Sequence, residues 1–414
     1  MLDLTEPAQA AREQMHEIGA ADAVIGMFDA NSPEKVARFV AAARECVGSL
    51  AKTVRMVLLH GAPPHAAVPS GAGDERIHVL PYPLGEPGGP DDPVQTVFRA
   101  YRAVMDVGAD LNARACAIVW PDPETLTSQW LYNLIQPVLE LDFDLVTPCY
   151  AHHKFEALLT TGVIAPFERA LYGKRIPHPL GPDFGLSGRL THHLRDRAAQ
   201  LAKFNEWLFP VSEAIRAGFD ICRAHIGVRR YPAADWTNLS TAMVQVLGAV
   251  FHEAEQNASF WQRIRGSQEV PVFGEPASVP GVPDTVDVRR LFESFQLGCR
   301  NLQEVWSAVL PPTTMLEFRK LAQLPLESFR LPDALWARTV YDFGLGYHLK
   351  TINQDHLLRS MTPLYLGWVV SYAQEVVESG PLAVEDRLER LSAAFEAAKP
   401  YLVSRWRWPD RFNP

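Results

Sequence analysis

Asp183 is the first residue whose type and setting could do chemistry. It lies within residues 175–190, RIPHPLGPDFGLSGRL, a segment that holds three prolines and three glycines. Proline fixes φ and glycine permits positive φ, so the segment is predicted to form a shaped loop. Loops on a rigid scaffold often carry catalytic or binding residues. The alternative is that Asp183 caps a short helix that follows it.

Asp122 is the second carboxylate in a suggestive place. It follows the fully apolar run ACAIVW at 115–120, which is typical of a central strand. Open α/β sheets bind ligands just beyond the carboxyl ends of their strands. A carboxylate there could hold a divalent cation or a sugar hydroxyl, but the prolines on either side of Asp122 favour a simple turn equally well.

The histidines do not form a recognised metal motif. The pairs at 152–153 and 192–193 are adjacent, whereas one helix face binds a metal through histidines at i and i+4. His348 and His356 could face one side of a helix only if that helix continues between them. The sequence has no G-x-x-x-x-G-K-[ST] phosphate loop, no G-x-G-x-x-G between a strand and a helix, and no G-x-S-x-G motif.

Several basic side chains lie within or near the segment that contains Asp183. They are Lys154, Arg169, Lys174, Arg175 and Arg189. Lys and Arg can neutralise phosphate oxygens as a metal ion does, Arg through two parallel hydrogen bonds. The alternative is that these residues form a solvated basic helix face and loop.

Strand-length and helix-length segments alternate in the first half of the chain. One helix is predicted to start at Ser32, which can act as its N-cap ahead of Pro33 and Glu34. The predicted strands cover 21–28, 53–59, 77–81, 115–120 and 142–149, and further helices cover 94–107 and 127–141. This order is typical of a parallel α/β sheet.

Helical periodicity dominates the second half. The predicted helical stretches are 199–218, 238–265, 287–308, 314–324, 333–348, 354–379 and 383–398, with breaks or kinks expected at Pro210 and Pro363. A proline-rich connection at 271–283 marks a change of domain. The predicted organisation is an N-terminal helix over 1–20, an α/β domain over 21–265 and a helical C-terminal domain over 266–414.

Composition and charge narrow the function classes. A net charge of -9 argues against a nucleic-acid or anionic-membrane partner. No apolar run approaches the ~20 residues that a membrane-spanning helix needs, and the first residues lack the apolar stretch of a signal peptide. The 5 cysteines are scattered and form no C-x-x-C pair, which predicts reduced, mostly buried thiols and a cytoplasmic protein.

Several segments of the chain resemble nucleotide-sugar glycosyltransferases of the GT-A fold. The closer resemblance is to enzymes related to family 2 and akin to mannosylglycerate and glucosylglycerate synthases. It covers residues 20–405 and is carried by ADAVIGMFDANS, PCYAHHKFEALLTTGVIAPFERALYGKRIPHPLGPDFGLSG, AIRAGFDICRAHIG, LPDALWARTVYDFGLGYH, QDHLLRSMTPLYLGWVVSY and FEAAKPYLVSRW. It implies a mixed sheet flanked by helices in a GT-A-like domain, followed by a helical C-terminal domain.

The resemblance also implies a function and a site. A sugar would pass from a nucleoside-diphosphate donor to a small polar acceptor, with the loop around Asp183 lining the reacting carbon and Asp122 holding a sugar hydroxyl or a metal. The donor positions correspond to Phe28, Asn31, His60 and Trp120. The acceptor-side candidates are His153, Phe184, Gly185, His348 and His356.

The donor positions depart from the family pattern. The acidic D-x-D motif appears as Trp120-Pro121-Asp122, and His60 stands where an acidic residue is expected after the second strand. Two further expected ligands appear as Trp207, next to Glu206, and as Tyr231. We therefore expect no ordinary metal site, with Asp122 as the remaining candidate ligand and Mg²⁺ or Mn²⁺ bound only if the site is retained.

Two functions remain open from the sequence. The chain is either a metal-independent glycosyltransferase that uses basic residues on the diphosphate, or a catalytically silent relative that acts as a binding or scaffolding protein. The first implies a nucleoside-diphosphate sugar and a small polar acceptor as partners. The base, the sugar, the acceptor, the stereochemical outcome and any homo-oligomer are left open.

Overall fold

The computed structural model describes most of the chain. The described residues are 15–27, 32–61, 74–81, 93–120, 125–201, 209–231, 238–279, 281 and 285–408. They divide between two compact units. Unit 1 comprises Met1–Ala151, His178–Arg230 and Val270–Val279, and unit 2 comprises His152–Pro177, Tyr231–Glu269 and Pro280–Pro414. The units thus interleave along the chain.

Unit 1 is built on an eight-stranded sheet in the order β3-β2-β1-β4-β6-β5-β7-β8. The strands are β1 (Ala23–Met27), β2 (Met56–His60), β3 (Ile77–Pro81), β4 (Ala115–Val119), β5 (Leu145–Ala151), β6 (Phe184–Ser187), β7 (Ile221–Val228) and β8 (Val272–Phe273). β6 pairs antiparallel with β4 and β5, and the other pairs are parallel. The predicted mixed sheet is confirmed.

β6 corrects one sequence prediction. Residues 175–190 were expected to form a loop throughout, but 184–187 form this strand and a helix begins at Gly188. Asp183 therefore precedes a strand and does not cap a helix. The strand forms because both of its neighbours, β4 and β5, supply ladder partners that lie far away in the sequence.

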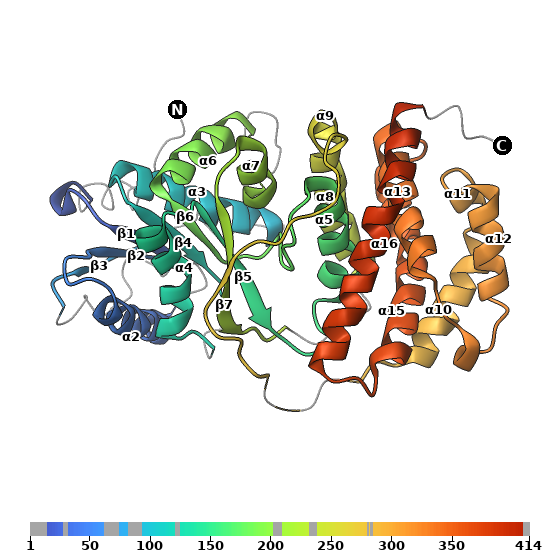
Figure 1. The fold of residues 1–414 in the computed structure, drawn as a ribbon, viewed down its shortest axis with the longest axis horizontal. Helices are drawn as coiled ribbons and strands as arrows, with labels where there is room; N and C mark the ends of the chain where they lie inside the picture. The colour runs from blue at the N-terminus through green and yellow to red at the C-terminus, as the bar shows by residue number, and fades with distance from the viewer. Residues whose placement is uncertain are drawn as a thin grey trace. The chain divides into compact units, whose positions relative to one another are not determined.

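Helices cover both faces of the sheet (Figure 1). One layer contains α2 (Pro33–Ser49) and α4 (Ser128–Leu141). The other contains α3 (Pro93–Asp110), α6 (Gly188–Leu201) and α7 (Pro210–Ala217). The expected flanking of the sheet by helices is confirmed.

Local capping explains where two of these helices begin. The Ser32 side chain accepts a hydrogen bond from the backbone N–H of Lys35 at the start of α2, as predicted. Thr127 does the same for Trp130 at the start of α4. Each hydroxyl satisfies a backbone donor that has no partner within the helix.

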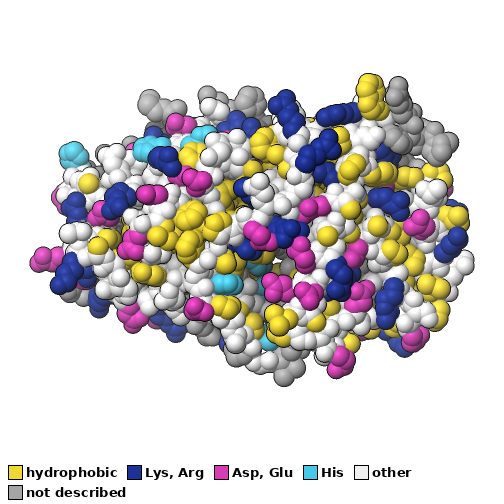
Figure 2. Space-filling model, viewed as in Figure 1, with side chains coloured by type: hydrophobic (Ala, Val, Ile, Leu, Met, Phe, Trp, Pro, Cys, Tyr) yellow, Lys and Arg dark blue, Asp and Glu magenta, His cyan; other side chains and the backbone are white. Residues whose placement is uncertain are grey.

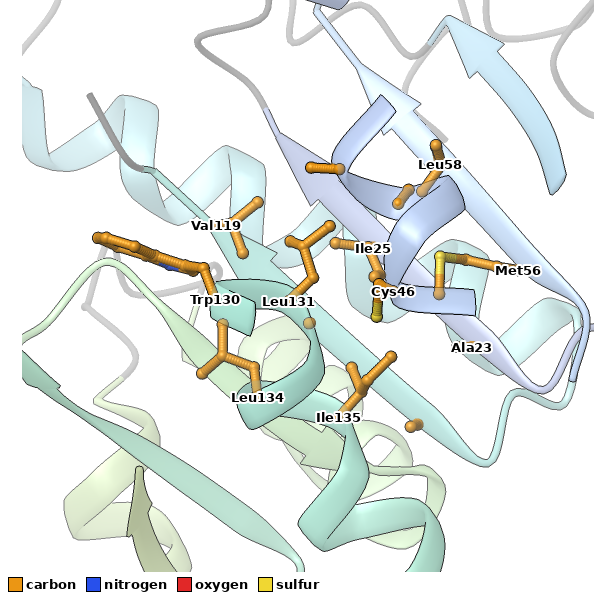
Figure 3. Close-up of a cluster of buried hydrophobic side chains, with 14 of the residues drawn as sticks. Ala23, Ile25, Cys46, Met56, Leu58, Val119, Trp130, Leu131, Leu134 and Ile135 are labelled. Atoms are coloured by element: carbon orange, nitrogen blue, oxygen red, sulfur yellow. The ribbon is translucent and has the colours of Figure 1, made fainter. Parts of the chain in front are cut away.

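The core of unit 1 lies between the sheet and the α2–α4 layer (Figure 3). Ile25 from β1 meets Leu131 and Ile135 from α4, and Cys46 from α2 lies beside them. All residues of β1, β2 and β4 within the strands are buried, so these strands are apolar on both faces. Within these three strands the polar side chain is that of His60, at the end of β2.

Unit 2 is helical, as predicted for the C-terminal part. Its helices are α5 (Ala165–Tyr172), α8 (Leu239–Gln256), α9 (Ala258–Trp261), α10 (Val288–Asn301), α11 (Gln303–Ser307), α12 (Pro312–Leu321), α13 (Asp333–Leu349), α14 (Gln354–Ser360), α15 (Thr362–Val376) and α16 (Pro381–Arg407). A π-helical turn at Thr160–Ile164 leads into α5, and a 3₁₀ turn lies at Leu326–Ser328. The predicted break at Pro363 is confirmed, because α14 ends at Ser360 and α15 begins at Thr362 with Pro363 in its first turn.

The surface and the cysteines agree with the expectations from composition. Lys and Arg side chains are interspersed with Asp and Glu over the visible face of the molecule (Figure 2). All five cysteines are free and buried. Among the described helices, no segment is long and apolar enough to cross a membrane.

Candidate functional site

The carboxyl ends of three strands of unit 1 meet the start of β6 at one edge of the sheet. Trp120 directly follows β4, Tyr150 lies near the end of β5, and Arg229 directly follows β7. Because β6 is antiparallel, its first residue lies at this same edge, with Asp183 just before it. The strand order thus brings together four residues that are far apart in the sequence.

Asp183 is the centre of a hydrogen-bond network. Its Oδ1 accepts from the backbone N–H of Trp120 at 2.7 Å. Its Oδ2 accepts from the Tyr150 hydroxyl and from Nη1 of Arg229, the latter at 2.9 Å. Nη1 of Arg229 also donates to the Trp120 carbonyl at 3.1 Å. The carboxylate therefore ties together the ends of β4, β5 and β7.

The burial of Asp183 decides what its carboxylate can touch. The residue is 0% exposed, and the Arg229 side chain is 16% exposed. Burial raises the pKa of Asp183, while the charge of Arg229 and the hydrogen bonds from Tyr150 and Trp120 oppose that rise. In this geometry a ligand would meet Arg229 before it met Asp183.

Aromatic rings hold the Arg229 and Tyr150 side chains in place. The Arg229 guanidinium lies over the Tyr150 ring, 5.0 Å from its centroid. His178 packs edge-on against the same ring at 4.9 Å, and Trp130 lies at 5.9 Å. These contacts restrict the rotamers of the network, so its charges are oriented before any ligand arrives.

The loop before Asp183 is anchored to α3 at Gly181, where it also lies close against β5. The Tyr101 hydroxyl donates to the Gly181 carbonyl at 3.0 Å. A Cβ at position 181 would lie 2.7 Å from Cγ of Pro148 and 3.3 Å from the Tyr150 hydroxyl oxygen. Only glycine lets the loop approach this closely. At this position the glycine therefore shapes the loop, as the sequence predicted.

His60 ends β2 at the edge where the parallel strands finish. It is buried, and burial lowers the pKa of its imidazole to about 4. The side chain is therefore neutral near pH 7 and can take part in hydrogen bonds without adding charge. The other predicted donor residues, Phe28 and Asn31, lie outside the described residues, as does Asp122.

Phe184 and Gly185 pack within unit 1. Phe184 is fully buried and meets Tyr101 edge-on at 5.8 Å. A Cβ on Gly185 would lie 1.9 Å from the Leu134 carbonyl oxygen, so the glycine allows α4 to pack directly on β6. A contact of either residue with an acceptor stays a prediction.

Four of the five predicted phosphate-binding cations belong to unit 2. There Lys154 donates to the carbonyls of Val376, Val377 and Ser379 at the end of α15. Arg169 binds Glu389 and Glu396 of α16, Lys174 binds Gln268, and Arg175 binds Glu269. Each of these cations has a structural partner within unit 2.

The fifth cation, Arg189, lies at the opposite edge of the sheet from Asp183. It binds Asp144, just before β5, with 2.9 Å between Nη2 and Oδ2. Strand β6 separates Arg189 from Asp183, and a strand rises about 3.3 Å per residue. The two residues therefore do not share one site, contrary to their grouping in the sequence.

The three histidines predicted on the acceptor side belong to unit 2. His348 stacks on Trp406 at 4.1 Å, with its Nδ1 3.0 Å from Glu255. α13 ends at Leu349, so the helix does not continue from His348 to His356 as a shared face requires. His153 donates its backbone N–H to Glu156, and His356 is exposed. Their role with an acceptor stays a prediction.

The described residues around Asp183 do not fit a divalent metal. At this edge the Asp183 carboxylate is engaged by the backbone N–H of Trp120, the Tyr150 hydroxyl and the Arg229 guanidinium. Over the described part of the chain, no three His, Cys, Asp or Glu side chains are grouped so that they could hold a metal ion. Trp207 and Glu206 are outside that part.

Sequence reasoning missed Tyr150 and Arg229 as members of this site. The available signal was their position, since each lies at the end of a strand-length segment. Their partnership with Asp183 depends on the strand order β4-β6-β5-β7, which no local pattern reveals.

Comparisons with known proteins give distant structural similarity. No protein-family model and no curated protein matches the sequence. Glucosyl-3-phosphoglycerate synthase from Mycobacterium tuberculosis, solved with Mn²⁺, UDP and glucosyl-3-phosphoglycerate, is 13% identical with a TM-score of 0.33, over 61% of this chain and 86% of that chain. Mannosyl-3-phosphoglycerate synthase from Rubrobacter xylanophilus is 14% identical with a TM-score of 0.36, over 61% and 79%. A function for this chain has to be argued from its own residues.

Proposed function

We propose that the chain transfers a sugar from a nucleoside-diphosphate donor to a small polar acceptor at the carboxyl edge of the unit 1 sheet. One observation carries the proposal. The segment at 148–188 that resembles GT-A glycosyltransferases contains both Tyr150 and Asp183, and a second such segment, at 214–227, ends two residues before Arg229. These residues meet in one network at the edge where open α/β sheets bind ligands.

Arg229 is the group best suited to the leaving diphosphate. As the bond to the sugar breaks, negative charge develops on the phosphate oxygens. A guanidinium held in advance stabilises that charge without reorganisation. Asp183 and the Tyr150 ring fix the position of the Arg229 guanidinium, the first by a hydrogen bond and the second by a cation–π contact. Asp183 is then a positioning residue that acts through Arg229, because its buried carboxylate is already engaged.

The remaining roles stay as the sequence suggested them. Asp122 would bind a sugar hydroxyl, and Phe28, Asn31 and His60 would lie near the nucleotide. The residues described around Asp183 do not fit a divalent metal, so no step is assigned to one. Added Mg²⁺ or Mn²⁺ is instead a variable of the experiment.

A second function has an observation in its favour. The hydrogen bonds of Asp183 go to Trp120, Tyr150 and Arg229, all groups of the protein itself. A chain that keeps this network only for stability would be a silent relative of glycosyltransferases, one that binds a ligand or partner without transferring sugar.

A thermal-shift panel separates these functions. UDP, GDP, ADP and their sugars would be tested, each with and without Mg²⁺ or Mn²⁺. A ligand at 100 times its dissociation constant adds about 2.7 kcal/mol of stability, which shows as a higher melting temperature. A shift with one nucleotide that ignores metal supports the proposed transferase and names the donor class. No shift with any nucleotide contradicts it.

A turnover assay with the identified donor then tests the role of Arg229. Arg229→Gln should lower hydrolysis of the sugar donor, or sugar transfer, by about 10²-fold or more. A loss of this size is expected when a preoriented hydrogen-bonding group that stabilises developing negative charge is removed. Glu45→Gln, at an exposed position on α2, is the matched control and should keep full turnover. A folded Arg229→Gln protein with full turnover would exclude this role.

A further inference from the structure

Unit 2 contains two buried glutamates on neighbouring helices, α5 and α8. Glu168 on α5 is 7% exposed and Glu253 on α8 is 8% exposed. The helices are in contact, since the rings of Phe167 and Phe251 lie 5.4 Å apart. Carboxylates are rarely this buried unless they are paired or neutralised.

Glu253 has the partners that a buried carboxylate needs. The Tyr172 hydroxyl donates to its Oε2 at 2.5 Å, and Nδ2 of Asn257 donates to its Oε1 at 2.6 Å. Tyr172 lies one helical turn after Glu168 on α5, so the two residues share a helix face. Both oxygens of Glu253 are therefore stabilised in the ionised form.

Glu168 is in the opposite situation. Its Oε1 is buried and accepts no hydrogen bond. Burial, and then the negative charge of Glu253, raise the pKa of Glu168 well above its ordinary value. An ionised carboxylate at this position would be a buried charge beside a like charge.

The charged groups of α16, which packs against α5, are directed elsewhere. Arg169, the neighbour of Glu168 in sequence, binds Glu389 and Glu396. The Lys399 ammonium donates to the carbonyls of Leu171 and Ile264.

The charged groups of α8 and of the π-helical turn do not supply a cation either. On α8, Glu255 binds His348, and His252 has its own interaction. The turn at Thr160–Ile164 carries no charged residue. Among the described groups that act on Glu168, Glu253 is the charged one, and it is negative.

We propose that Glu168 and Glu253 form a proton-binding site that makes unit 2 sensitive to alkaline pH. At neutral pH Glu168 holds one proton and the pair carries a single negative charge. When pH rises, that proton passes to solvent, the pair carries two negative charges, and the contact between α5 and α8 is weakened. This inference does not depend on the proposed sugar transfer.

The sign of the effect follows from linkage. A carboxyl group whose pKa is higher in the folded state binds its proton more tightly there than in the unfolded state. Its stabilising effect is complete below the unfolded value of about 4.3 and is lost as pH rises through the folded pKa. Stability should therefore fall with rising pH, by up to about tenfold in the folding equilibrium constant per pH unit.

The experiment compares the full chain with its Glu168→Gln variant, which keeps the shape of the side chain and cannot ionise. Amide hydrogen exchange in α5 and α8 is measured for both proteins at the same pH, so intrinsic exchange rates cancel. The ratio of protection, variant over wild type, should rise at least tenfold between pH 6 and pH 9. Glu385→Gln, at an exposed position on α16, is the control and should show no change.

A second variant and a direct spectrum keep the proposal testable if Glu168→Gln does not fold. Glu253→Gln removes the neighbouring charge and should reduce the pH dependence. Infrared spectra of the wild-type chain at pH 7 should show the carbonyl stretch of a protonated buried carboxylic acid, which fades at higher pH.

Three outcomes would overturn the proposal. The first is a protection ratio that does not change with pH. The second is an infrared spectrum at pH 7 with no protonated carboxyl. The third is stabilisation by added Mg²⁺ or Ca²⁺ that disappears in Glu168→Gln, because the pair would then hold a cation.

Discussion

The two units bury their charges in different places. In unit 1 the strands β1, β2 and β4 are fully buried, and the buried ion pair of Asp183 and Arg229 lies at strand ends. In unit 2 they lie between helices, as where Arg387 of α16 binds Asp333 of α13 and Glu375 of α15. A sheet of buried strands can offer chemistry only at its edges, whereas helices can pair charges along their whole length. The edge of unit 1 is therefore where a site for a polar ligand is expected.

Removing the carboxylate at position 183 is the change with the largest expected effect. Asp183→Ala leaves the Arg229 guanidinium without its buried partner and should cost about 3–5 kcal/mol of unfolding free energy. Urea unfolding measures this cost. The control is Glu45→Gln at an exposed site, which should stay within about 0.5 kcal/mol. A cost below about 1 kcal/mol would mean that the hydrogen bonds of Asp183 with Trp120, Tyr150 and Arg229 do not stabilise the sheet.

The neutral histidine at the edge should give unit 1 an acid-sensitive stability. The folded pKa of His60 is lowered to about 4, so the unfolded chain binds its proton first as pH falls. Between about pH 6.5 and pH 4 the chain should lose about 2–3 kcal/mol from this group.

His60→Gln is the variant that isolates this loss. In this variant the free energy of unfolding should change less between pH 7 and pH 5 than in the wild type, as measured by urea unfolding at the two pH values. Equal slopes for the wild type and the variant would show that His60 is charged or hydrated in the folded chain.

Breaking the matching contact in unit 2 should cost less. Asp333 and Glu375 have side chains that are 23% and 29% exposed, so they can regain water when Arg387 is replaced. Arg387→Met should cost about 1–3 kcal/mol, compared with the fully buried Asp183. The same urea assay decides this, and a cost equal to that of Asp183→Ala would remove the contrast between the units.

Backbone packing at the sheet gives a further, smaller contrast. Gly185→Ala places a Cβ against the Leu134 carbonyl and should cost about 1–3 kcal/mol, because the backbone of α4 must shift. Gly48→Ala on α2 meets no atom within 4 Å and should stabilise the chain by about 0.5–1 kcal/mol. Melting temperatures that move in opposite directions are expected, and a shift in the same direction would show that β6 and α4 separate easily.

The elements that the sequence predicted well are the ones with strong local signals. The strand at 77–81 has the predicted bounds, and α2 begins after Ser32, because apolar runs and capping residues act over short distances. β6 was missed because its sequence is broken by glycine and proline neighbours. Its stability comes from pairing with β4 and β5, which lie far away in the chain.

The site was only partly predictable for the same reason. Asp183 stood out through its local sequence, but its partners Tyr150 and Arg229 become neighbours only through the strand order. Arg189 shows that nearness in sequence is not enough, because it binds Asp144 at the opposite end of β6 from Asp183. Lys154 and Arg169 were grouped with Asp183 by sequence, but residues 152–177 belong to unit 2, so a role for them at this site stays a prediction.

The central claim is that a nucleoside-diphosphate sugar binds at the edge formed by Trp120, Tyr150, Asp183 and Arg229. Amide hydrogen exchange of the full chain, with and without the nucleotide found in the thermal-shift panel, tests this most directly. The account predicts slower exchange in the peptides that contain these four residues when the nucleotide is present. Unchanged exchange in these peptides, with protection only in unit 2 or nowhere, would contradict it.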